Sequence, residues 1–314
     1  MAEKKNRGKW IFIISVVLSL ALMSLIISGI LGLVAGGSDD RFVRDGKGNT
    51  ALLRINGVLL TETSPSLFGG QAETSASTLV RELDRINRDA TIQAVIFEVN
   101  SPGGTPVASE EIAHAIKNLD KPTVVYIRDI GASGGYWVAS ASDHILASRL
   151  SFVGSIGVIG SYLEFSGLMD RYNVTYQRFV GGDYKDFGSP FRMPEEGASE
   201  LFQQQIDVVY DIFVDEIAQN RNMSRDDVLS LANGMVFTGS QALDLGLIDG
   251  IGGRREAVEY LEQTYNMTVN VVEYKRRVTL FDIFMMAQLN RAYSIGQGIG
   301  DSLVRSSTER RIMV

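Results

Sequence analysis

The sequence predicts an α/β fold in which parallel strands alternate with helices. Segments typical of a strand, a loop and a helix repeat at intervals of about 30 residues in the middle of the chain, and glycine-rich loops follow the predicted strands. Parallel βα units of this kind place their active site at the carboxyl ends of the strands. The 314 residues therefore accommodate a single domain of about 200 residues, together with a membrane segment and irregular ends.

The composition excludes several classes of function. The net charge of -7, with no basic run beyond the N-terminus, argues against nucleic acid as a partner. The chain has no cysteine, which excludes thiol catalysis, disulfides and cysteine-ligated metals. Its two histidines, His114 and His144, are too few for a histidine-rich metal site. We therefore predict neither a metal nor a cofactor.

An apolar run near the N-terminus predicts a membrane anchor. Residues 10–35 are apolar apart from serines and glycines, and roughly 25 such residues are enough to cross a bilayer. Basic residues lie before this run and two aspartates lie after it, so we expect residues 1–9 in the cytoplasm and the main body beyond the membrane. This predicts a single-pass protein of the cell membrane with an uncleaved anchor and a linker at 36–50. Cleavage near Ala35 would instead release an exported protein.

The first predicted elements of the domain follow the linker. Residues 51–60 suggest two short strands around Asn56-Gly57, a dipeptide typical of hairpin turns. The polar residues 61–78 predict a loop. Apolar residues at helical spacing between 79 and 86 then predict a helix.

Two βα units occupy the centre of the chain. Residues 92–99 form a predicted central strand that ends in a glycine-containing loop. Thr105 and Pro106 suit the cap and the first position of a helix that extends through Ile116. The next predicted strand, at 123–127, leads to the turn Gly131-Ala132-Ser133-Gly134-Gly135 and to a helix at 137–141.

The remaining predicted elements complete the domain. They are a strand at 143–147, an apolar stretch at 153–159, a strand at 173–180, and a turn, short helix and strand within 235–253. Apolar residues recur every three or four positions from Phe202 to Ile217, which predicts one face of a long amphipathic helix packed on the core. The domain then covers 51–265 and leaves a tail at 266–314, whose apolar residues 281–286 are too few to span a bilayer.

Ser133 is the candidate nucleophile. It lies among glycines where a strand ends and a helix begins, and the unpaired amides of a helix N-terminus stabilise a developing oxyanion. Gly104, after the preceding strand, could present its amide to the same oxyanion, and such a donor is worth about 3 to 4 kcal/mol of barrier. A small-residue turn after a strand is also common in α/β proteins that have no catalytic serine there.

Lys185 is the candidate general base. Past the membrane segment the lysines are Lys47, Lys117, Lys121, Lys185 and Lys275. Lys185 alone follows a glycine pair and lies between two aromatic residues, Tyr184 and Phe187. An apolar setting lowers the pKa of a lysine, and a neutral amine can take the proton of a serine hydroxyl. The alternative is an exposed loop lysine paired with Asp183 or Asp186.

The histidines are weaker candidates for the base. His114 lies in the middle of a predicted helix. His144 follows Asp143 at the start of a strand, where neighbouring side chains point to opposite faces, so these two residues cannot form a compact dyad. A Ser-His-Asp triad is therefore disfavoured. Ser155, between glycines, could hold a lysine amine through its hydroxyl or could simply form a turn.

Five motifs in combination identify a family. In order they are Asn100-Ser101-Pro102-Gly103-Gly104, Ala132-Ser133-Gly134-Gly135-Tyr136, Gly154-Ser155-Ile156-Gly157-Val158, Tyr184-Lys185-Asp186 and Ala242-Leu243-Asp244-Leu245-Gly246-Leu247-Ile248-Asp249. The chain resembles the short, single-copy form of bacterial signal peptide peptidase A, a membrane-anchored Ser-Lys protease. The resemblance implies a single protease domain of repeated ββα units, similar to the Clp protease subunit and the crotonases.

The resemblance also implies roles for individual residues. Ser133 matches the nucleophile, Lys185 the general base and Ser155 the serine that hydrogen-bonds the lysine amine. The amides of Gly104 and Gly134 match the oxyanion donors. Short relatives bring the lysine of one subunit to the serine of its neighbour in a ring-shaped oligomer, so we expect the same kind of homo-oligomer here.

The implied activity is endopeptidase cleavage of apolar peptides, such as remnant signal peptides after their release from preproteins. Three alternatives remain: a protease of the same clan that cuts one specific membrane protein, a crotonase-like acyl-thioester enzyme, and a catalytically inactive scaffold on this fold. The predicted export argues against the acyl-thioester enzyme, because coenzyme A is cytoplasmic.

Overall fold

A computed structural model describes residues 15, 18, 19, 22–24, 42–63, 73–195 and 197–276 of the chain. The chain forms two compact units, and the larger one, residues 44–65 and 70–275, holds the helices and most of the sheet. The predicted anchor at 10–35, apart from six positions, and the apolar residues 281–286 lie outside the described residues. Among the residues that are described, no helix has both the length and the apolar character needed to cross a bilayer.

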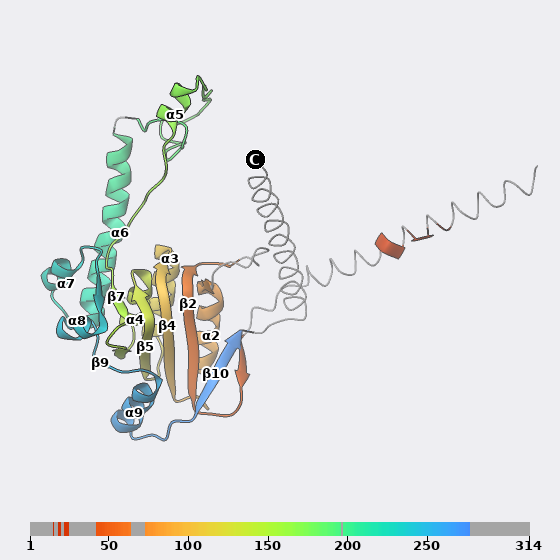
Figure 1. The fold of residues 1–314 in the computed structure, drawn as a ribbon. Helices are drawn as coiled ribbons and strands as arrows, with labels where there is room; N and C mark the ends of the chain where they lie inside the picture. Colours follow the sequence, from red (N-terminus) through yellow and green to blue (C-terminus); the bar gives the residue numbers. More distant parts are fainter. Residues whose placement is uncertain are drawn as a thin grey trace, which may run out of the picture. The chain divides into compact units, whose positions relative to one another are not determined.

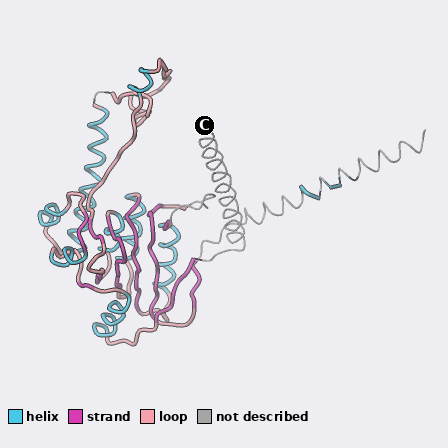
Figure 2. Tube along the Cα trace, viewed as in Figure 1, coloured by secondary structure: helices cyan, strands magenta, loops and turns pink. Residues whose placement is uncertain are grey.

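The centre of the larger unit is a ten-stranded sheet of mostly parallel strands (Figures 1 and 2). The strands are β1 (Phe42–Asp45), β2 (Thr50–Leu60), β3 (Glu73–Ser75), β4 (Ala94–Gly104), β5 (Thr123–Ala132), β6 (His144–Ala147), β7 (Phe152–Gly154), β8 (Val236–Thr238), β9 (Gly250–Ile251) and β10 (Val271–Arg276). The main order is β1-β10-β2-β4-β5-β6-β9; β3 pairs with β2, and β7 pairs with β5 and β8. The predicted α/β architecture with parallel strands is confirmed.

Helices connect the parallel strands, as crossover connections between such strands require. They are α2 (Ala76–Arg88), α3 (Pro106–Lys117), α4 (Gly134–Ser140), α5 (Ser166–Arg171), α6 (Ala198–Arg221), α7 (Arg225–Leu231), α8 (Gly239–Asp244) and α9 (Arg254–Tyr265). Ala257 and Leu261 of α9 pack with Ile96 and Val124 on one face of the sheet. The alternate strand residues point to the opposite face, where α2, α3 and α4 pack against one another and α4 contacts β4 and β5.

The predicted hairpin at residues 51–60 is wrong. The structure has a single strand, β2, which pairs in parallel with β4 along its length. The register with β4 shifts between Asn56 and Val58, because Gly57 adopts a positive φ of 68° and forms a bulge rather than a turn. The dipeptide therefore signals a real backbone irregularity, but the chain continues in the same direction.

The predicted strand at 173–180 is also absent. These residues form an irregular segment in which Phe179 is 93% exposed. The alternation of apolar residues there is typical of a strand, but none of the described strands pairs with this part of the chain. At the other end of the domain, β10 lies within the range 266–314 predicted as a tail, and it pairs in parallel with β2.

Candidate active site

The carboxyl ends of β4 and β5 bring the predicted site residues to one edge of the sheet. The two strands pair in parallel, with Val95 opposite Thr123 and Ser101 opposite Gly131. The loop that contains Gly104 therefore lies beside the turn that contains Ser133. Both segments precede helices, so two helix N-termini, those of α3 and α4, begin at this edge.

Ser133 occupies a strained position at the start of α4. It is the residue before the first helical turn, with φ 51° and ψ -128°, a conformation that costs a residue with a side chain about 1–3 kcal/mol. The Ser133 amide donates to the carbonyl of Gly154 at 2.7 Å, and the carbonyl of Ser133 accepts from the amides of Tyr136 and Trp137. These bonds hold the turn so that the side chain is partly exposed beside the helix N-terminus.

Two glycine amides lie next to this turn. Thr105 donates its amide to Leu59 of β2 at 2.9 Å, and since successive amides of a parallel strand point to opposite sides, the Gly104 amide points away from β2. A Cβ placed on Gly134 would lie 3.3 Å from the Gly104 nitrogen, and one placed on Gly103 would lie 2.8 Å from the Gly134 nitrogen. The backbone nitrogens of Gly104 and Gly134 therefore lie close together beside the Ser133 turn. Amides so placed are the kind of donor that stabilises an oxyanion.

Ser155 lies beside Ser133 on the neighbouring strand. Ala132 is opposite Gly154 in the β5–β7 pairing, so the next residues along the two strands are neighbours. Ser155 has a positive φ of 50°, its amide donates to Met235 at 2.8 Å, and its Oγ donates to the Gly234 carbonyl at 3.0 Å. Because this bond uses the only hydroxyl proton, the Ser155 oxygen is left to accept hydrogen bonds from a third group.

Within a single subunit, Lys185 is separated in space from Ser133 and Ser155. It is exposed, in a turn closed by its own amide donating to Gly182 at 3.2 Å. The nearby Phe187 ring packs on Phe202 of α6, with centroids 4.9 Å apart. Phe213, eleven residues further along α6, packs on Trp137 of α4, so the two contacts are about 16 Å apart along the helix. No contact among the described residues joins Lys185 to Ser133.

Three other lysines that follow the apolar N-terminal run have different surroundings from Lys185. Lys121 donates to the carbonyls of Asp89 and Ile92 at 2.6 Å, Lys117 donates to Asn220, and Lys275 pairs with Asp45. These three amines have structural partners. Within the described part of the chain, Lys185 has neither Asp183 nor Asp186 as an ion-pair partner, because Asp186 binds two arginines instead.

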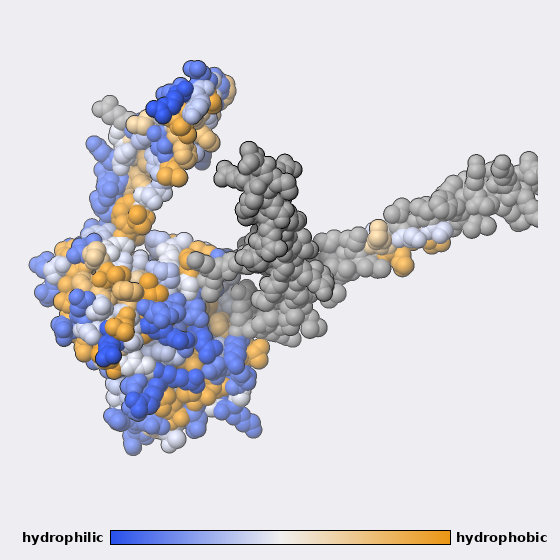
Figure 3. Space-filling model, in the orientation of Figure 1, coloured by the Kyte–Doolittle hydropathy of each residue, from blue (hydrophilic) through white to orange (hydrophobic). Residues whose placement is uncertain are grey.

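The segment that carries Lys185 exposes many apolar side chains. We call residues 156–195 the arm; it includes α5 and, as Figure 1 shows, lies at the N-terminal end of α6. Exposed apolar residues of the arm include Ile159, Leu163, Leu168, Tyr172, Phe179 and Met193. Leu201 and Val208 continue this surface onto α6. Figure 3 shows hydrophobic patches both on this segment and beneath it.

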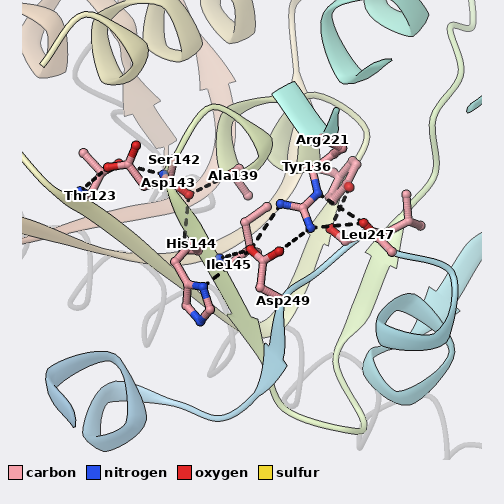
Figure 4. Close-up of polar contacts among 11 residues, drawn as sticks. Thr123, Tyr136, Ala139, Ser142, Asp143, His144, Ile145, Arg221, Leu247 and Asp249 are labelled. Carbon is pink, nitrogen blue, oxygen red and sulfur yellow. Dashed lines mark hydrogen bonds and ion pairs between the residues drawn. The ribbon is translucent and has the colours of Figure 1, made fainter. Parts of the chain in front are cut away.

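A buried polar network supports the helix that begins at Ser133. The Tyr136 hydroxyl donates to the Leu247 carbonyl at 2.7 Å, and Arg221, at the end of α6, donates to the Gly246 carbonyl and to Asp249 (Figure 4). Burial tends to raise the pKa of Asp249, but the hydrogen bonds and charge of Arg221 outweigh it and hold that pKa below its ordinary value. The network fixes α4 and the C-terminal end of α6 to the same loop.

Neither histidine reaches the serine turn. His114 of α3 lies 3.5 Å from Glu216 of α6, and His144 stacks on Tyr260 with its Nδ1 3.8 Å from Asp249. Asp143 instead accepts from the amide and hydroxyl of Thr123. In the described ranges no group of three histidine or acidic side chains could hold a metal ion.

Sequence reasoning missed the groups that hold the site residues in place. In the sequence, Ser101 is only a member of a motif, and Arg221 is only a residue near the end of a predicted helix. The two arginines that bind Asp186 are six and eight positions away from it in the chain. The sequence suggested Asp183 or Asp186 as an ion-pair partner of Lys185, whereas Asp186 binds Arg178 and Arg192. One sequence signal could have indicated a cluster of charged side chains: along one irregular segment, the acidic Asp186 lies between the basic Arg178 and Arg192.

The geometry at the sheet edge defines a class of enzyme. A serine in a strained turn at a helix N-terminus, with two glycine amides close by, is an arrangement typical of acyl transfer in α/β enzymes. The features that distinguish one such enzyme from another are the group that activates the serine and the surface that receives the substrate.

Comparison with known proteins assigns the chain to a family. The model of peptidase family S49 matches residues 115–268. The chain is 32% identical over 300 residues to a protein of Methanocaldococcus jannaschii named as a protease, covering 94% of this chain and 95% of that one. It is also 32% identical to a protein of Enterococcus faecium named as a signal peptide peptidase, covering 88% and 87% of the two chains. Protease 4 of Haemophilus influenzae is 32% identical over 219 residues, which are 67% of this chain and 35% of that protein. The chain belongs to peptidase family S49, and this supports a role as a protease.

Proposed function

We propose that the protein is a membrane-anchored serine endopeptidase that uses Ser133 and Lys185 to degrade apolar peptides, such as remnant signal peptides. The observation that carries the proposal is the strained Ser133 turn, beside which the amide nitrogens of Gly104 and Gly134 lie close together. The printed name of the Enterococcus relative supports the choice of substrate. The apolar residues 10–35 support the anchor and a catalytic domain outside the cytoplasm. We also propose that the α/β fold of this protein is of the Clp-like type, which is built from repeated ββα units.

The chemistry proceeds through an acyl-enzyme. The neutral Lys185 amine takes the proton of the Ser133 hydroxyl, and the oxygen attacks the carbonyl carbon of the peptide bond. The amides of Gly104 and Gly134 donate to the resulting oxyanion. The protonated lysine then gives its proton to the leaving amine, and an ester links the acyl group to Ser133. Water, deprotonated by the same lysine, hydrolyses this ester and restores the serine.

Ser155 has a defined part in this scheme. Its hydroxyl donates a hydrogen bond to the Gly234 carbonyl, so its oxygen can accept a hydrogen bond from the lysine amine. An amine that donates to Ser155 directs its lone pair elsewhere, and Ser133 is the neighbouring group that needs a base. Ser155 therefore orients the amine without exchanging protons with the substrate.

The position of Lys185 supports completion of the site by a second subunit. The amine lies on the exposed arm, and the arm and the adjoining part of α6 present an apolar surface that a neighbouring copy could cover. In a homo-oligomeric ring every arm would lie against the next subunit, so each Ser133 would receive Lys185 from its neighbour in the same way. Burial of the arm in this interface would also provide the apolar surroundings that a neutral lysine needs.

Two single substitutions test the assignment. In the full-length protein in detergent micelles, S133A and K185A are each expected to lower kcat for a fluorogenic apolar peptide by about a thousandfold or more, because each removes a reacting group. Circular dichroism should show unchanged secondary structure. Activity retained in either folded variant would defeat the proposal. Mass spectrometry of a digested peptide library would identify the cleavage preference and separate general peptide degradation from cleavage at one specific sequence.

A further inference from the structure

A cluster of four charged side chains closes the turn that carries Lys185. The Asp186 carboxylate accepts from Arg178 Nε and Nη2, both at 2.9 Å. It also accepts from Arg192 Nε at 2.9 Å and Nη2 at 2.6 Å. Glu195 lies 3.0 Å from Arg178 and 3.4 Å from Arg192. Each arginine thus holds one carboxylate by a two-pronged contact, the strongest geometry for such a pair.

The cluster ties together parts of the arm on both sides of Lys185. Arg178 lies seven positions before the lysine and Arg192 lies seven positions after it, and both meet at the residue that follows the lysine. Arg178 also donates to the Asp183 carbonyl at 2.8 Å. In a segment without regular secondary structure, these side-chain contacts add to the backbone hydrogen bonds of the turn and help to fix its path. The Asp186 side chain is 21% exposed and Arg192 18%, so solvent weakens the contacts only in part.

The cluster also determines whether Asp186 can form an ion pair with the neighbouring Lys185 amine. Adjacent Cα atoms are about 3.8 Å apart, so an unoccupied Asp186 carboxylate could turn towards the Lys185 amine. An ion pair of that kind favours the protonated amine and removes the base that the proposed reaction needs. Four hydrogen bonds from two arginines occupy both oxygens of the carboxylate instead.

Other charged and titratable groups lie near the turn that carries Lys185. Hydrogen bonds from Arg192 and Arg178 hold the pKa of Asp186 well below its usual range, so the carboxylate is charged at every pH at which the enzyme would work. The groups around the turn besides these are Asp183, Glu195, Tyr176 and Tyr184. Glu195 binds the same two arginines, but Asp186 is the residue next to Lys185, so its release is the one that places a carboxylate beside the amine.

We propose that Arg178 and Arg192 are positioning residues for the Lys185 base: they fix the turn and keep the Asp186 carboxylate from pairing with the amine. This inference rests on the proposed function, in which Lys185 takes the serine proton. It predicts two separable effects of breaking the cluster, a looser turn and a new partner for the amine. The second effect changes the pH dependence of catalysis, whereas a purely structural role does not.

The test compares pH profiles of kcat/KM for full-length variants with an apolar fluorogenic peptide. R192Q leaves Arg178 as the one arginine on Asp186 and so weakens the hold on the carboxylate. We expect the acidic limb to move by up to about one pH unit to higher pH, which lowers kcat/KM at pH 7 by up to about tenfold and restores much of it at alkaline pH. In R192Q/D186N the released carboxylate is absent, so the limb should return towards the wild-type position although kcat stays reduced. R192K keeps the charge but not the two-pronged contact, and should fall between R192Q and the wild type.

A matched control is available on the other side of α6. Arg225 bridges Asp211 and Asp215 with one side chain, at a more exposed position than Arg192 (44% against 18%), and it lies at the start of α7, outside the arm. R225Q removes the same charge from a similar double bridge and should leave the pH profile unchanged. Folding and assembly of every variant are checked by circular dichroism and gel filtration, and R192K serves in place of R192Q if the latter does not fold.

The outcomes separate this inference from the proposed function. A uniform loss of activity in R192Q at all pH values, or a wild-type profile, overturns the inference. A shifted limb that D186N does not correct also overturns it, because the carboxylate is then not the cause. If K185A abolishes activity in these cases, the proposed function stands without the positioning role. If K185A is active, the proposed function itself fails.

Discussion

At the scale of single residues, the Ser101 hydroxyl links two strands at the edge that carries the site. It is fully buried, donates to the Gly57 carbonyl at 2.6 Å and accepts from the Gly103 amide at 3.1 Å. Gly57 is the bulge of β2, and Gly103 precedes the residue whose amide is assigned to the oxyanion. One hydroxyl therefore takes up the Gly103 amide and fixes the direction of the next one, which remains available to substrate.

We predict that S101A lowers kcat by about 10- to 100-fold with little change in KM, because a displaced oxyanion donor affects the transition state more than the bound peptide. The substitution also leaves a buried carbonyl and amide without this partner, at a cost of about 1–3 kcal/mol in the free energy of unfolding. Steady-state kinetics and urea denaturation measure the two effects. S142A is the control, since that buried hydroxyl donates to Ala139 at the other end of α4. Equal kcat losses in both variants would reduce the role of Ser101 to folding.

His144 gives the stability of the protein a defined pH dependence. Burial lowers its pKa from the ordinary value of 6.5, and the nearby charge of Arg221 acts in the same direction, although Asp249 opposes them. Below about pH 6.5 the unfolded chain binds a proton at this residue that the folded chain does not yet bind, so stability falls as the pH falls. The contribution is complete above pH 6.5 and is lost as the pH drops towards the lower folded-state pKa.

We expect H144F to reduce this slope, since phenylalanine keeps the stack on Tyr260 but does not titrate. Urea midpoints measured at pH 7.5, 6.5 and 5.5 should decline less in H144F than in the wild type. The Asp249 carboxylate near His144 (Figure 4) does not interfere in this window, because its pKa lies below its ordinary acidic value. Parallel declines in the two proteins would show that other groups cause the pH dependence.

At the scale of elements, the two halves of α6 have different surroundings. Phe213 is 2% exposed and stacks on Trp137, and Val214 and Ile217 are also buried. In the N-terminal half, Phe202 is 38% exposed and meets the sheet domain only through the arm. The apolar periodicity is the same in both halves, so the expectation that this helix packs on the core is confirmed for the C-terminal half and wrong for the N-terminal half.

This difference predicts unequal effects of truncating two phenylalanines on one helix. F213A should lower the free energy of unfolding by about 3–5 kcal/mol, because it opens a cavity between α6 and α4. F202A should lower it by about 1 kcal/mol or less in the dissociated subunit, where its ring is partly in solvent. Urea denaturation at a concentration that favours single subunits measures both. Similar losses would indicate that the arm is an integral part of the core.

Sequence patterns predict the elements that sequence-local chemistry determines. Pro106 after Thr105 marks the start of α3, and the glycines around Ser133 mark the turn after β5, because caps and tight turns depend on neighbours in the chain. The path of β2 through Asn56-Gly57 depends instead on its pairing with β4, and residues 173–180 lack a partner strand. The same limit applies at the site: Ser133, Ser155 and the glycines lie at strand ends, whereas the contacts of Asp186 arise from the folding of the arm.

At the scale of the whole molecule, the separation of the two proposed catalytic residues is the feature that demands explanation. Ser133 is fixed by the sheet edge and α4, and Lys185 is carried by an arm attached to the exposed half of α6. Two arrangements would bring these residues together: closure of the arm within one chain, and contact between chains. Exposed apolar side chains on the arm favour the second, since a soluble surface does not normally present so many together.

Mixed oligomers distinguish the two arrangements. S133A subunits retain the lysine and K185A subunits retain the serine, so co-expression of the two inactive proteins with different affinity tags should restore activity to complexes purified on both tags. With random mixing, roughly a quarter of the interfaces combine an intact serine with an intact lysine, and activity should approach that fraction of the wild type. S133A co-expressed with the S133A/K185A double variant is the matched control and should remain inactive. If the first mixture is also inactive although both tags are present in assembled complexes, each subunit must complete its own site, and the arm would have to close onto the serine turn of the same chain.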